Sequence, residues 1–311
     1  MQPYALMFHH FVGGRHPAGQ GALSATTFRS LLDAEPNLLS ARAWLHDAMH
    51  DDLSLDARCI TFDDGLRCQI DIALPILEER NLTAMWFVHS AAINGEGDHL
   101  ELYRHYRMTA FEHVDAFYDA FEMTARECGH DLLLRTELDL VDTRQHLAAF
   151  PFYTDADRRF RYLRDRVLGP DRYHATMQHM LDAWHVDRNA LTSQLWMSRD
   201  DVRRLHDAGH VIGLHSHDHP TDLKALSKHD QQQQYLQNAA CLAACTGEQP
   251  IVAAHPCNSY NDETLGILTE LGVRIAFRSN VAMTDGSYLE WPREDPANLL
   301  RARSTHAGAM A

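Results

Sequence analysis

The sequence predicts an α/β protein built on parallel strands, and two observations support this class. Residues 59–66 (CITFDDGL) are a short apolar run that ends near a glycine, and a helical segment (67–80) and a second apolar run (83–88) follow. This succession of strand, turn, helix and strand is typical of parallel α/β architecture. The same alternation resumes at Leu195, after a long stretch of helical pattern (95–194).

The N-terminal part of the chain adds one strand and one helix. Tyr4 to Val12 is apolar enough to form a first strand. Ser24 to Leu32 has apolar residues on one helical face, so it is predicted to be a helix with Ser24 as its N-cap. Within 67–80, we expect Pro75 to kink or restart the helix, because proline lacks the main-chain N–H.

Residues 95–194 are predicted to form a helical insertion. Aromatic residues recur there at helical spacing, and such a stripe is more often a packed core than a binding site. Because the insertion separates two segments that carry candidate site residues, it is a candidate lid or subunit interface. Residues 1–94 and 195–311 are then expected to form one discontinuous α/β domain.

Regular elements return after the insertion. Residues 198–210 (SRDDVRRLHDAGH) are predicted to form a helix with Ser198 as its N-cap and Gly209 at its C-terminal end. The elements predicted beyond it are strand 211–214, helix 222–245, strand 251–254, a helix from Asn261 or Asp262 to Gly272, and strand 274–278.

Composition indicates which partners the protein does not bind and in which compartment it is expected. The formal net charge of −15 over 311 residues argues against a nucleic acid or an anionic membrane, since both need a basic face. The six cysteines form no CxxC pair, which indicates reduced thiols. The N-terminus lacks the basic region of a signal peptide, and no stretch approaches the roughly 20 apolar residues of a membrane-spanning helix. We therefore expect a cytoplasmic protein.

Two adjacent carboxylates mark the first candidate site. Asp63 and Asp64 follow an apolar strand, and a buried pair of like charges requires either a shared proton or a neutralising cation. A solvated loop is the alternative interpretation of this pattern. The stretch GLHSHDHP, residues 213–220, favours a cation because it places His215 and His219 after another apolar strand.

Histidine pairs four residues apart are weak evidence alone, because 22 histidines produce roughly one or two such pairs by chance. The pairs His46–His50 and His206–His210 are therefore interpreted as exposed helix residues. A catalytic zinc site takes three protein ligands with nitrogen or oxygen donors and keeps one position open. Asp64, His215 and His219 supply such a set, and Asp63 is left outside it.

These residues carry a resemblance to a known family. The TFDDG motif and the HSxxHP motif, the latter preceded by AGHVIG, resemble those of the polysaccharide deacetylases of the NodB-homology type, a carbohydrate esterase group. AHPCNSYNDETLGILTELGV is similar to the third motif of that family, and the resemblance covers about residues 1–94 and 195–300. It implies a distorted (β/α)7-type barrel. It also implies that Asp63 is the catalytic base, that Asp64, His215 and His219 bind a divalent metal such as zinc, and that the Cys257 main-chain N–H donates to the oxyanion.

The sequence departs from the family pattern at two roles. The third-motif arginine that orients the base is matched by Ala254, so Arg293 in WPRED is the candidate substitute. The terminal Leu-x-His motif, which provides the general acid, is missing. His9 and His255 are candidates for that acid, ahead of His306 in the polar tail.

The resemblance implies a hydrolase that removes an N-acetyl or N-formyl group from an amino sugar. In the cytoplasm its substrate would be a nucleotide-linked or lipid-linked precursor of a surface polysaccharide or lipopolysaccharide. Two alternatives stay open: a cyclic imide or ureide amidohydrolase of the same fold, and a non-catalytic sugar-binding relative. The expected partners are the sugar or glycan precursor and, as a candidate, a second copy of the chain.

Overall fold

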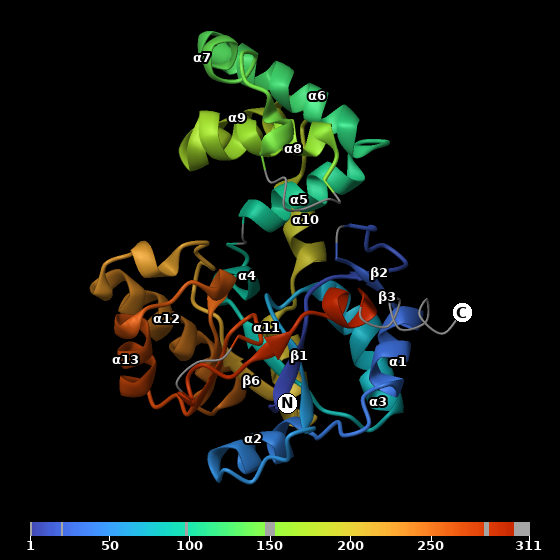
Figure 1. The fold of residues 1–311 in the computed structure, drawn as a ribbon, viewed down its shortest axis with the longest axis vertical. Coiled ribbons are helices and arrows are strands. Elements are labelled where there is room, and N and C mark those ends of the chain that lie inside the picture. Colours follow the sequence, from blue (N-terminus) through green and yellow to red (C-terminus); the bar gives the residue numbers. More distant parts are fainter. Residues whose placement is uncertain (1, 20, 97–98, 147–152, 283–285, 302–311) are drawn as a thin grey trace. The chain divides into compact units, whose positions relative to one another are not determined.

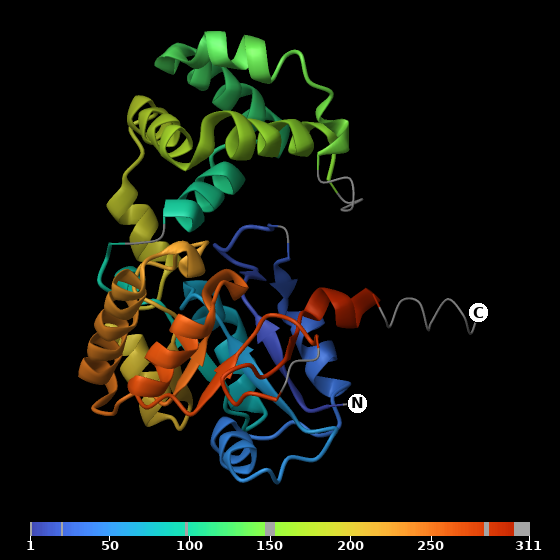
Figure 2. The same ribbon diagram turned by 60° about the vertical axis from the view of Figure 1, so that its left-hand side comes forward.

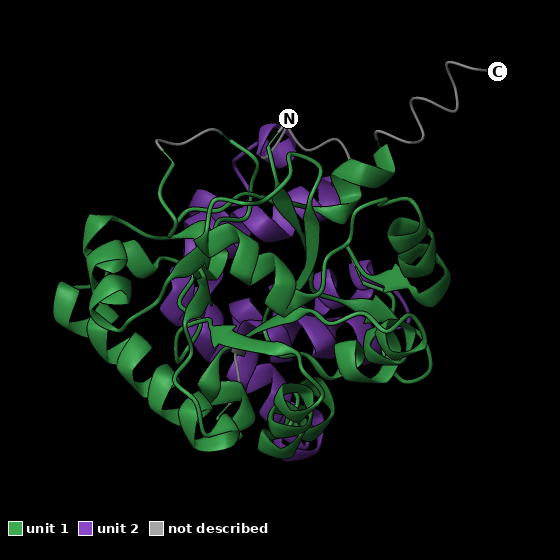
Figure 3. Cartoon of the chain, turned by 90° about the horizontal axis from the view of Figure 1, so that it is seen from below, with its two compact units in different colours: residues 1–98, 192–311 green, residues 99–191 purple. Residues whose placement is uncertain are grey.

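The computed structural model describes residues 2–19, 21–96, 99–146, 153–282 and 286–301. The chain divides into two compact units, which Figure 3 colours separately. Unit 1 comprises Met1–Asp98 and Thr192–Ala311, and unit 2 comprises His99–Leu191. No helix in the described ranges is both long enough and apolar enough to cross a membrane.

Unit 1 is built on a seven-stranded parallel sheet that nearly closes into a barrel (Figure 1). A parallel bridge between Phe277 and Trp291 joins the two edges of the sheet. The strands, in the order in which they pair, are β8 (Ile275–Phe277), β7 (Val252–Ala254), β6 (Val211–Leu214), β5 (Met85–Val88), β4 (Arg58–Phe62), β1 (Tyr4–Phe8) and β9 (Arg293–Glu294). The predicted α/β class and the seven-stranded barrel are confirmed.

Helices surround this barrel (Figure 2). The helices of unit 1 are α1 (Ala25–Asp33), α2 (Ala41–Met49), α3 (Leu74–Glu79), α4 (Ser90–Ile93), α11 (Arg199–Asp207), α12 (Lys228–Thr246) and α13 (Asp262–Glu270), and α10 (Arg188–Leu195) connects the units. The strands and α2 together bury Trp44, Phe87, Val252 and Phe277 in one apolar cluster. Three predicted caps are confirmed, since Ser24, Ser198 and Asn261 each accept a main-chain N–H of the helix that follows.

The predicted first strand, Tyr4 to Val12, is wrong in one respect. It breaks at His9, and Phe11–Val12 forms a separate strand, β2, which pairs with β3 (Leu23–Ser24) in a two-stranded sheet. The apolar pattern continues across the break because Phe11 packs against Phe28 outside the barrel. Periodicity alone does not reveal such a change of sheet.

Several short elements escaped prediction, α2 and β9 among them, and one helix restarts just before its proline. The helix α2 and the strand β9 were not expected; β9 spans only two residues, too few to show a pattern. The segment 67–80 contains a π-helical turn, Gln69–Ala73, and continues as α3 from Leu74, so the helix restarts one residue before Pro75.

Unit 2 is all helical within its described residues. Its helices are α5 (His99–Thr109), α6 (Val114–Ala125), α7 (Asp131–Glu137), α8 (Asp155–Tyr162) and α9 (Gly169–Ala183), with π-helical turns Arg126–His130 and Leu163–Leu168 and a 3₁₀ turn at Thr143–Gln145. Phe117, Phe121 and Phe160 pack together at its centre and are nearly inaccessible to solvent. The aromatic stripe predicted there as a core is thus a core, although Trp184 at its end is half exposed.

Candidate metal and catalytic site

The site is assembled at the carboxyl ends of the barrel strands. The residues directly after β1, β4, β5, β6 and β7 are, in that order, His9, Asp63, His89, His215 and His255. Because all these strands are parallel, their carboxyl ends meet at one edge of the barrel, where α/β enzymes place their chemistry.

The turn after β4 separates the two aspartates. Asp64 adopts a left-handed conformation with φ of 74°, which is costly for a residue with a side chain, and Gly65 follows with φ of 67°. A Cβ on Gly65 would lie 2.9 Å from Val88 Cγ1, so the turn requires glycine. Among the described residues, five of the eight non-glycine residues with positive φ lie on the loops of this site: Asp64, Ser216, His219, Cys257 and Asn258.

Asp64, His215 and His219 converge as the sequence predicts. Their potential ligand atoms all lie within 4.8 Å of one another. The Oδ1 atom of Asp64 is 3.3 Å from His215 Nε2 and 3.4 Å from His219 Nε2, yet this buried oxygen has no hydrogen-bond partner among the described residues. A buried carboxylate oxygen between two imidazole nitrogens, without a hydrogen bond, fits a divalent metal ion.

Neighbouring groups fix the orientation of His215. Its Nδ1 donates to the main-chain carbonyl of Ala254 at 2.9 Å, so Nε2 faces Asp64. The main-chain N–H of His215 donates to Asn238 Oδ1, and Asn238 Nδ2 donates to the Val88 carbonyl, both at 2.9 Å. Such outer contacts hold metal-binding histidines in place.

The pKa of Asp64 lies well below its ordinary value. Burial acts to raise the pKa, but the electrostatic effect of His219 and the contact with His215 outweigh burial. The carboxylate is therefore ionised at neutral pH, as a metal ligand must be.

Asp63 is held by Arg293. The guanidinium donates from Nη1 to Oδ1 at 2.6 Å and from Nη2 to Oδ2 at 2.7 Å. Both side chains are nearly inaccessible to solvent, and Arg293 Nε donates to the carbonyl of Arg278. Burial would raise the pKa of Asp63, but Arg293, with smaller effects from His215 and His9, lowers it.

The two candidate acids lie in different surroundings. His9 Nε2 is 3.6 Å from Asp63 Oδ2, and about a third of its side chain is exposed. Loss of hydration lowers the pKa of His9, and Asp64 and Asp63 oppose this only in part. His255 is buried, its Nε2 donates to the Leu289 carbonyl at 2.8 Å, and burial lowers its pKa to about 4. A nitrogen engaged with a main-chain carbonyl is poorly placed to protonate substrate.

Two further predicted residues, Cys257 and His306, lie in different parts of the chain. Cys257 lies on the loop after β7, with φ of 49° and an exposed side chain. The next residue, Asn258, accepts the Ser279 N–H through its side chain, which ties this loop to the segment after β8. His306 lies outside the described residues.

Sequence reasoning missed His89. The residue is 1% exposed, and its ring centroid is 5.5 Å from that of His219. Its Nδ1 has no hydrogen-bond partner within the described part of the chain, and burial together with His219 lowers its pKa to about 3. Its position directly after a predicted strand is the signal that could have found it, as it found Asp63.

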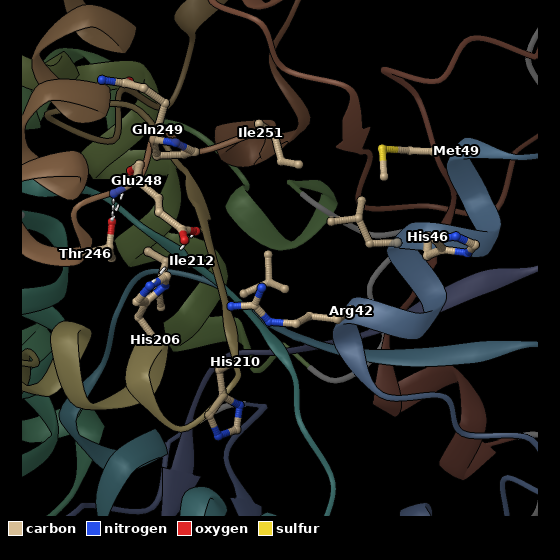
Figure 4. Close-up of a pocket in the computed structure, with 13 residues that line it drawn as sticks. Arg42, His46, Met49, His206, His210, Ile212, Thr246, Glu248, Gln249 and Ile251 are labelled. Carbon is tan, nitrogen blue, oxygen red and sulfur yellow. Dashed lines mark hydrogen bonds and ion pairs between the residues drawn. The ribbon is translucent and has the colours of Figure 1, made fainter.

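A separate pocket of about 220 Å³ lies at the opposite, amino ends of the strands (Figure 4). It is bordered by α2, the start of β6 and the segment before β7. His210 lines it, and the prediction that His210 is an exposed helix residue is wrong. The helix α11 ends at Asp207, and His210 is buried, with its Nδ1 accepting the N–H of Ala84 and the indole N–H of Trp86.

Comparisons with known proteins agree with this fold. Residues 167–276 match the family model described as polysaccharide deacetylase. That range contains His215 and His219 but not the aspartates. A search of curated proteins gives no match.

Several solved structures are similar over most of the chain. A deacetylase, PplD, of Streptococcus pyogenes in complex with acetate is 15% identical, with 97% of each chain covered and a TM-score of 0.57. IcaB of Ammonifex degensii is 15% identical, with 94% of this chain and 90% of that chain covered and a TM-score of 0.54. A de-N-acetylase of Aggregatibacter actinomycetemcomitans is 14% identical, with 94% and 95% covered and a TM-score of 0.52.

At these identities the likeness to solved structures establishes the fold. The family match adds the sequence of the HSxxHP region, and the barrel places that motif beside the aspartates of the TFDDG turn. Residues 167–276 thus resemble the polysaccharide deacetylase family, and the chain has the fold of the solved deacetylases named above.

Proposed function

We propose that this protein is a metal-dependent deacetylase that hydrolyses the N-acetyl or N-formyl amide of an amino sugar. The observation that carries the proposal is the orphaned buried oxygen of Asp64 between His215 and His219, next to an arginine-bound Asp63. These residues provide a cation site and, beside it, a separate carboxylate for proton transfer.

Asp64, His215 and His219 would hold the metal, which we propose to be zinc because two imidazoles and one carboxylate suit it. When bound, it would supply Lewis acidity toward the acyl carbonyl. Asp64 stays ionised and His215 stays oriented without further rearrangement, since the protein already holds both.

Asp63 is the proposed base that takes a proton from the attacking water. Arg293 keeps it ionised and fixes its plane, and each carboxylate oxygen keeps a second lone pair for the water. The main-chain N–H of Cys257 is the proposed donor to the oxyanion that forms on the acyl carbon.

His9 is the proposed proton donor to the leaving amine. At 3.6 Å from Asp63, it can receive the proton that the base has taken and deliver it to the nitrogen. Its lowered pKa keeps the imidazole neutral before the reaction, and it makes the protonated imidazolium a stronger acid.

The proposed substrate is a nucleotide-linked or lipid-linked amino sugar, a cytoplasmic precursor of a surface polysaccharide or lipopolysaccharide. Support comes from the net charge of −15, which disfavours nucleic acid, and from the deacetylases among the similar structures.

The test measures the acetate or formate that zinc-loaded protein releases from a panel of N-acetyl and N-formyl amino sugars. The panel contains each sugar both free and linked to a nucleoside diphosphate. We expect acetate or formate from at least one of them and none with Asp63→Asn. Zinc-loaded protein that releases no acylate from any member, yet opens a cyclic imide, would refute the proposal.

A further inference from the structure

The two histidines proposed to bind the metal are held in different ways. The ring of His215 is fixed by the hydrogen bond from its Nδ1 to the Ala254 carbonyl. His219 has a main-chain φ of 53°, which is costly for a residue with a side chain, and its N–H donates to Ser216 Oγ at 3.2 Å. This bond holds the main chain of His219, and other aromatic rings pack against its imidazole.

Two rings contact the His219 imidazole. The ring centroid of His215 lies 4.9 Å from that of His219, and the centroid of His89 lies 5.5 Å from it. His89 in turn contacts Trp196, whose ring is perpendicular to its own at 6.2 Å. The four side chains thus form a row of rings, in which His89 connects Trp196 to the two histidines.

The far end of this row is joined to the aspartate turn. Trp196 forms an antiparallel bridge with Leu66, and the N–H of the next residue, Met197, donates to the Gly65 carbonyl at 2.9 Å. The segment that supports the turn after Asp64 therefore also packs on His89. Through His89, the turn that carries one proposed ligand is packed to the loop that carries the other two.

The main chain beside His89 is bound to the loop of His219. The side chain of Ser90 forms a hydrogen bond of 2.8 Å with His217 Nδ1, and the N–H of Ala91 donates to the His217 carbonyl at 3.0 Å. His89 itself is 1% exposed. Because its surroundings are closely packed and its main chain is fixed, its ring has a defined place against His219.

The shape of the His89 ring, and not its Nδ1 atom, accounts for these contacts. Nδ1 is buried and has no hydrogen-bond partner in the described ranges. Among the described residues, the group whose potential ligand atoms lie within 4.8 Å of one another consists of Asp64, His215 and His219, without His89. A buried nitrogen without a partner costs free energy, so the packing of the ring must offset that cost.

We propose that His89 is a positioning residue for the metal site, and that its ring holds the imidazole of His219 in the orientation that binds the ion. This inference rests on the proposed function, because it takes Asp64, His215 and His219 as the metal ligands. It adds a residue that acts through a ligand rather than on the ion.

The test measures zinc affinity of the full chain by competition with a fluorescent chelator. His89→Ala removes the ring and should weaken zinc binding by about tenfold or more. His89→Phe keeps a flat ring and should bind within about threefold of the wild type. His89→Leu fills the space without a flat ring, so it should weaken binding as alanine does, and it replaces alanine if that variant does not fold.

The matched control is His210→Ala. His210 is also a buried histidine, but it lies at the opposite, amino ends of the strands. Its removal should lower the melting temperature and change zinc affinity less than about twofold, because it is remote from the site.

Absorption spectra of the Co²⁺-loaded proteins separate positioning from a general loss of stability. The visible bands of Co²⁺ depend on the geometry of its ligands. At saturating Co²⁺ we expect shifted bands in His89→Ala, and wild-type bands in His89→Phe and His210→Ala whatever their melting temperatures.

Three results would contradict the proposal, and they are distinguishable. Wild-type zinc affinity and an unchanged Co²⁺ spectrum in His89→Ala would overturn the role of His89 and leave the proposed function intact. Equally weak binding in His89→Ala and His89→Phe would show that a nitrogen of His89 is needed, which would overturn positioning by packing. Zinc binding that is unaffected in Asp64→Ala would refute the metal site itself, and this inference with it.

Discussion

Arg293 and Asp63 form a bidentate ion pair across 230 positions of sequence, with N–O distances of 2.6 and 2.7 Å. The two residues belong to β9 and to the end of β4, which are separated in the sheet by β1 alone. The last strand of the barrel thus orients the acid delivered by an early strand. The pair forms only when β9 is paired with β1, so formation of this edge of the sheet and orientation of the base are coupled.

Replacing Arg293 should weaken the base and shift its titration. Arg293 lowers the pKa of Asp63, so Arg293→Gln should raise that pKa and move the acidic limb of the kcat/KM profile to higher pH. We also expect kcat/KM to fall by about 10- to 100-fold at neutral pH. The measurement is a pH–rate profile on the best N-acyl sugar of the panel.

The matched control for this pair is Arg274→Gln. Arg274 is an exposed arginine directly before β8, and its loss should leave the profile in place. An acidic limb that does not move in Arg293→Gln would show that Asp63 is not the titrating base.

Metal binding should depend on each of the three predicted ligands. We expect about one zinc per chain in the wild type and less than about a tenth of that in Asp64→Ala, His215→Ala and His219→Ala. His46→Ala is the control, because His46 belongs to the exposed i, i+4 histidine pair on α2. Elemental analysis after dialysis gives the occupancy, and full occupancy in Asp64→Ala would contradict the assignment.

A site residue can be predicted from the sequence when the residues next to it already show a recognisable element. Asp63, Asp64, His215 and His219 follow recognisable strands, so their chemistry and their place at the strand ends can be read together. The role of Arg293 is different. It was singled out by resemblance, but a two-residue strand shows no periodicity, and only the pairing of β9 with β1 brings Arg293 to Asp63.

Other features depend on packing and were beyond local patterns. The apolar run from Tyr4 to Val12 continues across a change of sheet because both halves bury aromatic rings. His210 looks like a surface helix residue by its spacing from His206, but the helix has ended before it. The N–H of Ala84 and the indole N–H of Trp86 both donate to its ring. The order of residue types along the chain does not predict which residue gains hydrogen-bond or packing partners from distant segments.

That burial makes His210 a determinant of acid stability. Burial lowers its pKa from 6.5 to about 4. Its contribution to stability is complete above the unfolded value and is lost as the pH falls from 6.5 toward 4, by roughly 3 kcal/mol in all. His210→Gln keeps an acceptor but cannot titrate. Urea unfolding between pH 4 and 8 should therefore show a smaller loss in the variant, and equal slopes would refute this role.

Asn238 should control metal affinity without touching the metal. It joins the His215 N–H to the Val88 carbonyl, so Asn238→Ala should weaken zinc binding by about 10- to 100-fold. The control is Gln237→Ala, an exposed neighbour on α12. Competition with a fluorescent chelator measures the affinity, and equal values for both variants would exclude a positioning role.

Gly213 should be intolerant of even one added methyl group. A Cβ at this position in β6 would lie 2.5 Å from Phe87 Cδ1 and 2.8 Å from Val252 Cγ2. Neither neighbour has room to retreat, because both are completely buried in the barrel cluster. Gly213→Ala is therefore expected to lower the free energy of unfolding by about 1–3 kcal/mol.

Gly266→Ala provides the opposite expectation from the same chemical change. Gly266 lies in α13 with no atom within 4 Å of the added Cβ, so alanine should stabilise the protein by about 0.5–1 kcal/mol. Urea unfolding of both variants measures the contrast. Because Gly213 is two residues before His215, strain there should also reduce zinc affinity, whereas Gly266→Ala should leave it unchanged. We infer that the close packing of β6 against β5 and β7 holds His215 in position. A Gly213→Ala variant that is as stable as the wild type and binds zinc equally well would contradict this.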